Sequence, residues 1–179
     1  MRKLENSELK RPGAEQYQKT VKMPVTVVLD NIRSCHNIGS VFRTSDALLV
    51  EKIYLCGISS TPPDKEIRKT ALGAENTVPW EYLASTLEAV EVLKAKGYTL
   101  IAVEQVENSI SLKEYSPPEN TRLALVFGNE VKGVQQEVVN KCDLTVEIPQ
   151  YGTKHSFNIS VSVGIVLWDL FNKIRPNQT

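Results

Sequence analysis

The chain has 179 residues, which suits one domain of ordinary size. Hydrophobic residues make up 41% of it and charged residues 23%, and this composition excludes a disordered, collagenous or low-complexity protein. Lysine plus arginine equals aspartate plus glutamate at 21 each. Net charge therefore gives no reason to expect strong nonspecific attraction to nucleic acid or membrane, and any site for a polyanion must be local.

Cysteine usage and the apolar runs indicate the compartment. Cys35, Cys56 and Cys142 are odd in number and widely spaced, which argues against a disulfide framework or a Cys-x-x-Cys metal site and favours free thiols. The first residues lack the apolar stretch of a signal peptide, and no run approaches the ~20 apolar residues of a membrane span. We expect a cytoplasmic protein with no metal and no membrane partner.

The first segment, residues 1–22, is polar and carries six basic residues against three acidic ones. In a chain of net charge zero, this segment is therefore about +3 and the remainder about −3. We expect a solvated arm or short helix, or alternatively an arm that contacts phosphates. One domain should follow over residues 23–175.

Apolar runs then alternate with amphipathic segments. Strands are predicted at 25–30, 52–58, 98–105, 123–128 and 144–149. Helices are predicted at 40–50, 85–97, 133–142 and 158–174, with polar loops at 31–40 and 60–66. This alternation indicates an α/β fold: a mainly parallel sheet with helices on both faces. The ligand site is expected in the loops after the carboxyl ends of the strands.

The last predicted helix is apolar on more than one face. One apolar stripe comprises Ile159, Val163, Val166 and Leu170. Further apolar residues extend it around the helix: Val161, Ile165 and Trp168. A surface helix normally carries a single apolar stripe, so the second face needs a partner. In a protein of this size we expect a homodimer interface there.

Three polar segments follow predicted strands, at 31–47, 127–134 and 148–160. In the first, Asn37 and Arg43 are six residues apart, so we expect both side chains on the same side of a helix start. Taken alone, Asn37 would be a helix cap and Arg43 a partner in a surface ion pair.

The second segment, LVFGNEVKG, lacks the G-x-x-x-x-G-K-[ST] pattern and so does not predict a nucleotide triphosphate site. Taken alone, its Glu130 would be a solvent-facing carboxylate favoured by a helix dipole. The third segment, IPQYGTKHSFNIS, holds Ser156 and Asn158 two residues apart.

In order and content, the three segments resemble the motifs of the SpoU (TrmH) branch of the SPOUT methyltransferases, from about Val25 to about Asn172. That family methylates RNA ribose 2′-hydroxyls with S-adenosylmethionine as cofactor. The resemblance implies a C-terminal deep trefoil knot, an obligate homodimer and an RNA partner. It assigns catalytic roles to Asn37, Arg43, Glu130, Ser156 and Asn158. It assigns cofactor binding to Val103, Glu104, Gly128, Asn129, Ile148 and Phe157.

Some details of the resemblance bear on mechanism. Phe157 and Gln150 stand where many relatives have leucine and methionine, and both are compatible with cofactor contact through the main chain. The family's arginine, at Arg43 here, is thought to help deprotonate the ribose hydroxyl. A guanidinium has a pKa above ~12 and is a poor base. Positioning a phosphate and stabilising the forming alkoxide is chemically easier.

Other interpretations remain open. The core could serve a noncatalytic RNA-binding protein or a base-modifying enzyme, although no clear set of groups for activating a base is present. The substrate is expected to be tRNA more than ribosomal RNA, because no large accessory domain precedes the core. RNA would then be held by the dimer surface, the basic arm, Lys173 and Arg175.

Three further side chains of these segments have candidate roles. His36 beside Cys35 suggests a thiol pair, but neighbours on an extended loop tend to face apart. His155 is expected to orient its loop or contact RNA. Tyr151 is expected to stack on a base or to pack within the loop.

Overall fold

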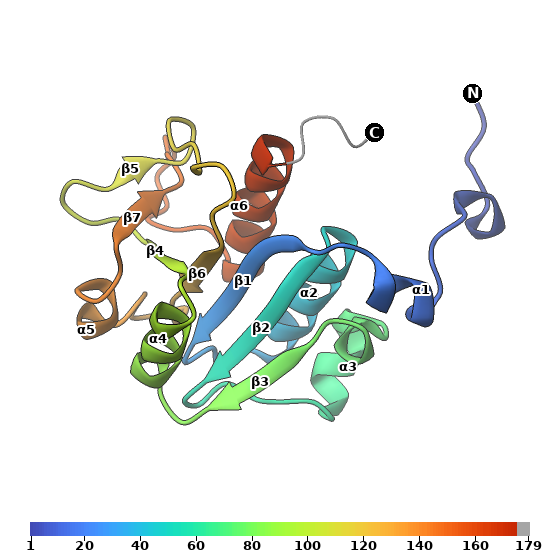
Figure 1. Cartoon of the computed structure of the whole chain (residues 1–179), viewed down its shortest axis with the longest axis horizontal. Coiled ribbons are helices and arrows are strands. Elements are labelled where there is room, and N and C mark those ends of the chain that lie inside the picture. The colour runs from blue at the N-terminus through green and yellow to red at the C-terminus, as the bar shows by residue number, and fades with distance from the viewer. Residues whose placement is uncertain (175–179) are drawn as a thin grey trace.

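The computed structural model describes residues 1–174, and a seven-stranded sheet forms the centre of this part of the chain (Figure 1). The strand order is β3-β2-β1-β6-β4-β7-β5, and every neighbouring pair is parallel. In chain order the strands are β1 (Met23–Asp30), β2 (Val50–Cys56), β3 (Trp80–Leu83), β4 (Thr99–Val103), β5 (Ile110–Ser111), β6 (Leu123–Phe127) and β7 (Leu144–Glu147). The predicted parallel α/β fold is confirmed.

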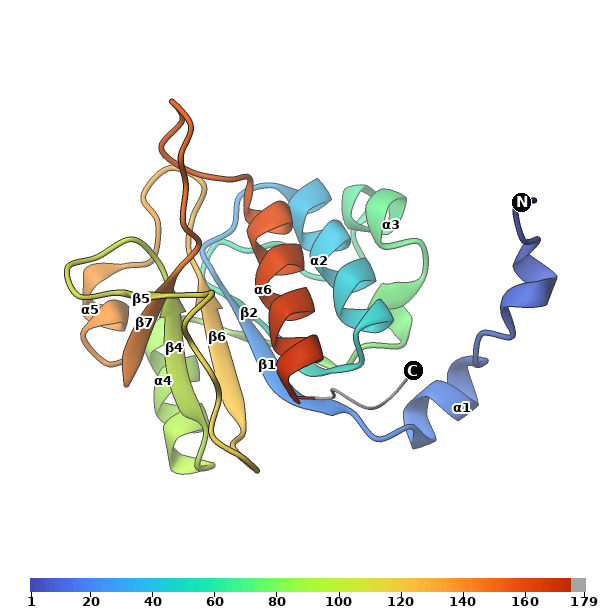
Figure 2. The same ribbon diagram turned by 90° about the horizontal axis from the view of Figure 1, so that it is seen from above.

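Helices cover both faces of the sheet, with α2, α3 and α6 on one side and α4 and α5 on the other (Figure 2). Their bounds are η1 (Asn6–Leu9), α1 (Ala14–Lys19), α2 (Cys35–Ala47), α3 (Lys65–Ala71), η2 (Ala74–Asn76), α4 (Thr86–Ala95), α5 (Gln136–Val139) and α6 (Ile159–Ile174). Alternating side chains of β1 serve the two cores, because successive residues of a strand point to opposite faces. Val27 and Leu29 pack in the core of α2 and α6, and Val28 packs in that of α4.

The first long helix differs from its predicted position at 40–50. It begins at Cys35 and ends at Ala47, because the side chain of Ser34 accepts a hydrogen bond from the main-chain N–H of Asn37 and caps it. The polar sequence of residues 31–40 had indicated a loop. Its second half is instead the first turns of α2.

Other differences involve short elements. The sequence predicts a loop at 60–66 and no element directly after it, whereas the structure has α3 there. Asp64 caps this helix by accepting hydrogen bonds from the main chain of Glu66 and Ile67. Strand β3 pairs only with β2, at the edge of the sheet, and its four residues are too few for a clear pattern. The helix predicted at 133–142 contracts to the four residues of α5.

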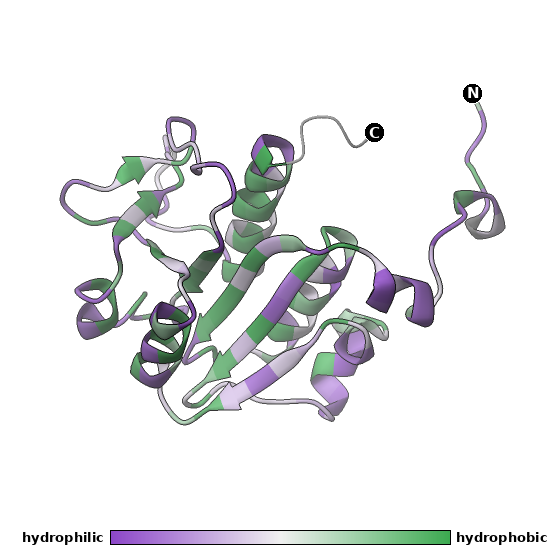
Figure 3. Ribbon diagram, in the orientation of Figure 1, coloured by the Kyte–Doolittle hydropathy of each residue, from purple (hydrophilic) through white to green (hydrophobic). Residues whose placement is uncertain are grey.

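Helix α6 has two apolar faces, as predicted. The core face is buried along its whole length, at Ile159, Val163, Val166 and Leu170. On the other side, Val161 is 48% exposed and Trp168 is 59% exposed. Figure 3 shows the apolar character of α6 along most of its length. The single chain therefore leaves a large apolar surface in water on this helix.

The N-terminal segment divides into two parts. Tyr17 of α1 is buried in the main core, and the side-chain amide of Gln18 donates to the carbonyl of Thr77 at 2.8 Å. Before α1 the chain stands away from the body of the domain (Figures 1 and 2). Only the part before α1 therefore projects as an arm. Within residues 1–174, no helix has the length and apolar character needed to cross a membrane.

Candidate functional site

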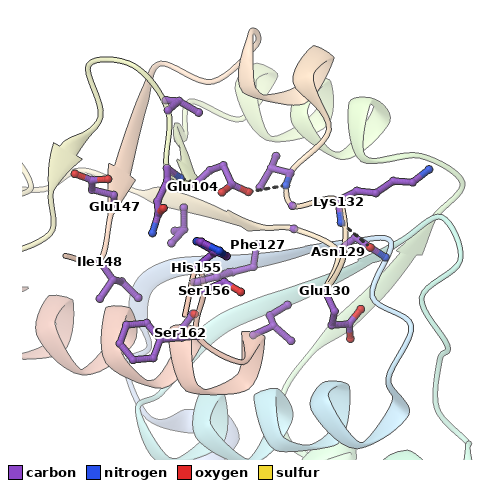
Figure 4. A pocket seen from close by; sticks show the side chains of 18 of the residues that line it. Glu104, Phe127, Asn129, Glu130, Lys132, Glu147, Ile148, His155, Ser156 and Ser162 are labelled. Carbon is purple, nitrogen blue, oxygen red and sulfur yellow. Dashed lines mark hydrogen bonds between the residues drawn. The ribbon is translucent and has the colours of Figure 1, made fainter. Parts of the chain in front are cut away.

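A pocket of about 690 Å³ lies at the carboxyl edge of the sheet, where β4, β6 and β7 end (Figure 4). Its volume is in the range usual for small-molecule sites. Three segments supply most of its lining: 103–106, 127–134 and 147–159. The parallel topology explains this convergence, because the carboxyl ends of parallel strands meet at one edge.

Nine of the eleven predicted site residues line this pocket: Val103, Glu104, Gly128, Asn129, Glu130, Ile148, Ser156, Phe157 and Asn158. The other two, Asn37 and Arg43, lie on α2 and are absent from its lining. The structure thus brings the second and third motifs together around one cavity, with the first motif beside it.

Glu130 joins the second motif to the first. Its carboxylate accepts hydrogen bonds from the main-chain N–H groups of Arg33 and Ser34 at 3.1 and 3.2 Å, and from the side-chain amide of Asn37 at 3.1 Å. Burial raises the pKa of Glu130, but these hydrogen bonds outweigh burial and leave the pKa below its usual value. Glu130 is therefore a carboxylate at neutral pH and sits at the positive N-terminal end of α2.

Asn37 is the junction of all three motifs. Its side-chain oxygen accepts a hydrogen bond from the amide of Asn158 at 3.2 Å, while its own amide donates to Glu130. The Asn158 oxygen in turn accepts from the main-chain N–H of Ser160 at 2.8 Å, at the start of α6. The cap of α2 is Ser34, so the interpretation of Asn37 as a helix cap is wrong.

Arg43 lies elsewhere on α2. Six residues rotate a helix by roughly 600°, about 120° short of two full turns, and advance about 9 Å along the axis. The expectation that Asn37 and Arg43 share one side of the helix is therefore wrong. Arg43 is exposed, and its guanidinium makes no hydrogen bond or ion pair with any residue of the described chain. The interpretation of Arg43 as a partner in a surface ion pair is therefore wrong as well.

The loop of the second motif is closed by its own main chain. Asn129 and Gly133 exchange two main-chain hydrogen bonds, at 3.0 and 2.9 Å. A Cβ on Gly128 would lie 2.0 Å from the carbonyl carbon of Gly133 and from the nitrogen of Val134. The glycine is thus required by the chain itself, whatever a ligand also needs.

The side chain of Asn129 is engaged within the chain at both its oxygen and its amide. Its oxygen accepts from the main-chain N–H groups of Val131 and Lys132 at 2.9 and 3.1 Å, and its amide donates to the carbonyl of Asn31 at 2.7 Å. Its main-chain N–H and carbonyl are also engaged, with Gly133. The second N–H of the side-chain amide is the donor that Asn129 still offers to a cofactor.

Glu104 ties the loop after β4 to the loop after β6. One carboxylate oxygen accepts from the main-chain N–H of Val134 at 2.9 Å. A Cβ on Gly133, where φ is +67°, would meet the same oxygen at 2.2 Å. Figure 4 shows Glu104 lining the same pocket as His155 and Ser156 of the third motif, and Glu130 at the side of the pocket that faces α2.

The sequence analysis missed a buried carboxylate that holds these loops. Asp30, at the end of β1, is fully buried and accepts hydrogen bonds from the hydroxyl of Thr86 and from both the main chain and side chain of Gln135, at 2.5 to 2.9 Å. These bonds join the chain after the second motif to the first turn of α4. An aspartate that closes an otherwise apolar strand was the signal that pointed to it.

The side chains of Cys35 and His36 face different partners. The thiol of Cys35 lies 3.4 Å from the hydroxyl of Ser60, and the imidazole of His36 lies 3.0 Å from the carboxylate of Glu66. They do not form a thiol pair. Within residues 1–174, no three His, Cys, Asp or Glu side chains are grouped to hold a metal ion.

The third-motif loop is open to solvent. Tyr151 is 96% exposed, so it stays free for stacking rather than packed in the loop. His155 is exposed and lines the pocket. Among the described residues, the main-chain N–H groups of 150–157 have no hydrogen-bond partner.

Comparison with known proteins gives a consistent family. The model of the SpoU rRNA Methylase family matches residues 24–168. The 23S rRNA (guanosine-2'-O-)-methyltransferase RlmB of Neisseria meningitidis is 33% identical over 144 residues, which cover 80% of this chain and 56% of that protein. The chain spans only about 60% of the length of the curated relatives that it matches.

Solved structures share the fold. The A. aeolicus TrmH/SpoU tRNA modifying enzyme superposes with a TM-score of 0.79 and 25% identity, over 91% of this chain and 82% of that one. The AdoMet-bound rRNA methyltransferase from Sinorhizobium meliloti gives a TM-score of 0.79 and 24% identity, over 89% and 59% of the two chains.

Proposed function

Because the chain belongs to the SpoU rRNA methylase family, we propose that it transfers the methyl group of S-adenosylmethionine to a ribose 2′-hydroxyl of RNA. The observation that carries this proposal is the chain of hydrogen bonds from Asn158 through Asn37 to Glu130. It holds three sequence motifs in one arrangement at the edge of a pocket. A protein that only needed a stable core would not require these polar groups to meet at its surface.

The pocket fits the proposed cofactor. Phe127, Ile148 and Phe157 provide apolar walls suited to a flat adenine ring. The free main-chain N–H groups of residues 150–157 are donors for the polar parts of the molecule. When bound, S-adenosylmethionine supplies a methyl group on a positively charged sulfur, which an oxygen nucleophile can take. Val103, Glu104, Gly128 and Asn129 complete this part of the site in the proposal.

The remaining predicted residues act on the RNA in this proposal. Arg43 is permanently charged and uncommitted, so it binds a phosphate next to the reacting ribose and stabilises the forming alkoxide. Ser156 lines the pocket and offers a hydroxyl to the ribose. Asn37, Glu130 and Asn158 are positioning residues, because their polar atoms hold the motifs together. Alignment of the two reactants supplies a large part of the rate, on the order of several kcal/mol.

Replacement of Arg43 by alanine tests the role proposed for this side chain. Methylation should fall by roughly 100-fold or more, while the Kd for S-adenosylmethionine stays within about twofold because Arg43 lies outside the pocket. Lys141→Ala, which removes an exposed cation on the other side of the sheet, is the matched control. Full activity in Arg43→Ala would remove this residue from the mechanism.

We propose that two copies of the chain associate through the exposed face of α6. Val161 and Trp168 lie there, and Trp168 stacks on Phe171 with ring centroids 6.3 Å apart. Gly164 lies on the same side and has open space where a Cβ would be, which suits close approach of a second helix. Trp168→Glu should give a monomer in sedimentation analysis, whereas Ile58→Glu, at an exposed apolar residue elsewhere, should not. A Trp168→Glu variant that stays dimeric would contradict this interface.

We propose that the C-terminal segment forms the trefoil knot of the family. In support, this segment leaves β7, which pairs with β4, and reaches α6, which packs against α2. On its way it lines the same pocket as the loops after β4 and β6. Knots are rare, so the test must be topological. Joining the termini of the folded chain and then denaturing it should give a more compact ring than the same ring closed from a chain never folded; equal sizes would contradict the knot.

We further propose a cytoplasmic enzyme made of one domain and an arm, with tRNA as its first substrate. The similarity to the A. aeolicus tRNA modifying enzyme over 82% of that chain supports tRNA. The projecting arm contacts RNA with its basic residues. Removing residues 1–13 should weaken RNA affinity and leave cofactor affinity unchanged; equal loss of both would make the arm structural. Lys173 uses its ammonium on the carbonyls of Leu112 and Tyr115, and Arg175 lies outside the described residues.

A further inference from the structure

Positive charge is concentrated on helix α3. Its seven residues include Lys65, Arg68 and Lys69 against Glu66, a net charge of about +2, and all three cations are exposed. On the opposite side of the sheet, α4 carries two glutamates and one lysine, a net charge of about −1. We call Lys65, Arg68 and Lys69 the α3 cationic face. Although the whole chain has zero net charge, α3 is thus clearly more positive than α4.

The acidic residues near this face are already engaged. Glu66 contacts His36 at 3.0 Å and Lys69 at 2.6 Å. Asp64 caps α3 through hydrogen bonds from the main chain. Within the described residues, the side chains of Lys65 and Arg68 have no hydrogen-bond or ion-pair partner. Their charges are therefore available to an external anion.

Helix α3 is held at a fixed place relative to the site. A Cβ on Gly39 would lie 2.2 Å from the carbonyl oxygen of Ile67, so the glycine lets α2 and α3 pack closely. The hydroxyl of Thr70 donates to the carbonyl of His36 at 2.9 Å, one residue before Asn37. Because α2 also carries Arg43, an RNA bound at the site would extend past α3 on a rigid surface.

The side chains on the surface of α2 and α3 indicate whether this surface suits base-paired or single-stranded RNA. Proteins that bind single strands stack the bases on exposed aromatic rings. Neither α2 nor α3 has an exposed Phe, Tyr or Trp, and the exposed imidazole of His36 is paired with Glu66. The exposed rings of Tyr151 and Phe157 lie instead in the third-motif loop. Base-paired RNA is bound mostly through its phosphates and 2′-hydroxyls, and lysine and arginine suffice for that.

From this division we propose that the α3 cationic face binds the phosphate backbone of a base-paired RNA stem next to the reacting nucleotide. The pocket side receives the unpaired nucleotide, and α3 receives the stem. The inference rests on the proposed function for the identity of the partner. It adds a second contact area that none of the three motifs contains.

The experiment compares Lys65→Gln/Arg68→Gln with Lys113→Gln/Lys141→Gln. Both double variants lose two exposed cations without a side-chain partner, and the second pair lies away from α3, after β5 and after α5. The probes are a 20-base-pair RNA duplex of arbitrary sequence and a 20-nucleotide oligouridine, titrated into the full chain between 50 and 200 mM salt. Thermal melting of each variant checks folding.

The first variant should bind the duplex on the order of 10-fold more weakly than wild type, with a salt slope of log K reduced by roughly 1.4 to 1.8 for two lost phosphate contacts. The control variant and the oligouridine should change less than about twofold. Arg68→Lys should keep duplex affinity, because a point charge suffices at a phosphate. Equal duplex binding in both double variants, or an equal loss for oligouridine, would overturn the proposal.

Failure here is distinguishable from failure of the proposed function. Cofactor binding and methylation at saturating RNA test the reaction, because the first does not involve α3 and the second is not limited by RNA affinity. If duplex binding depends on the α3 charges but no methylation occurs, the proposal of an RNA-binding surface on α3 stands and the proposed enzymatic function fails. If methylation occurs but duplex binding does not depend on the α3 charges, the proposed enzymatic function stands and the proposal of an RNA-binding surface on α3 fails.

Discussion

Replacing Gly128 by alanine tests why the second motif needs a glycine. The new methyl group would lie 2.0 Å from two main-chain atoms of residues 133 and 134. Main-chain atoms have no rotamer to change, so the loop must shift as a unit. Overpacking of this kind costs typically 1–3 kcal/mol, and we take about 2 kcal/mol as the working value.

This cost has two possible readouts. If the whole fold bears it, the melting temperature of the cofactor-free chain falls by about 4–8 °C, since 1 kcal/mol shifts a chain of this size by about 2–4 °C. If the loop opens instead, the fraction of molecules whose loop is closed and able to bind the cofactor falls roughly 30-fold. The Kd for S-adenosylmethionine then rises by the same factor. In that case amide exchange at Gly133 and Val134 accelerates, because both N–H groups are bonded only in the closed loop.

Differential scanning calorimetry, titration calorimetry with S-adenosylmethionine and amide exchange measure the three quantities. Gly152→Ala is the control, since Gly152 has nothing within 4 Å of a Cβ and no positive φ. The control should match wild type in melting temperature and in amide exchange at Gly133 and Val134. A Gly128→Ala protein with unchanged melting and unchanged amide exchange would refute the crowding explanation, and weaker cofactor binding in such a protein would mean that the glycine serves the cofactor alone.

Three further predictions concern the hydrogen-bond junction and the thiols. Asn37→Ala and Asn158→Ala should be non-additive by about 0.5–1 kcal/mol in a double-mutant cycle of unfolding, whereas strict additivity would mean that their hydrogen bond contributes nothing. Glu130→Gln should destabilise the fold by on the order of 1 kcal/mol at pH 7, discounted for solvent exposure. Because the folded-state pKa is lowered, the difference from wild type should shrink as pH falls below the ordinary carboxyl value of 4.5 and vanish below the folded-state pKa. A difference independent of pH would contradict the charged hydrogen bonds. Burial raises the pKa of Cys56 to about 12 and that of Cys142 to about 11. Iodoacetamide at pH 8 should therefore alkylate both thiols much more slowly in the folded chain than in urea, as measured by mass spectrometry. Equal rates would show that the thiols are not buried.

The sequence predicted the parts of the fold whose pattern is local. The strands at 25–30 and 123–128 are mostly apolar runs, and a run of that kind is typical of a buried parallel strand. The edge strand β3 and helix α3 gave no such signal, because one is half-buried and the other is seven residues long after two prolines. Their stability comes from packing against β2 and α2, which a local pattern does not contain.

The sequence predicted where the site lies, but not the hydrogen bonds that hold its residues together. Motifs after parallel strands had to meet at one edge, and they do. The bond from Glu130 to the start of α2 joins residues more than 90 positions apart, and no spacing indicates it. The reason for Gly128 also depended on knowing where residues 133 and 134 return. Asp30 was visible in the sequence, but its partners were not.

Methyl transfer itself is the most direct test of the central claim. The pure chain is incubated with S-adenosylmethionine labelled in its methyl group and, separately, with total tRNA and ribosomal RNA from cells that lack the gene. The RNA is then digested to nucleosides. The proposal predicts a labelled 2′-O-methylnucleoside, first in the tRNA pool. Absence of label from both pools, with cofactor binding confirmed by calorimetry, would contradict it.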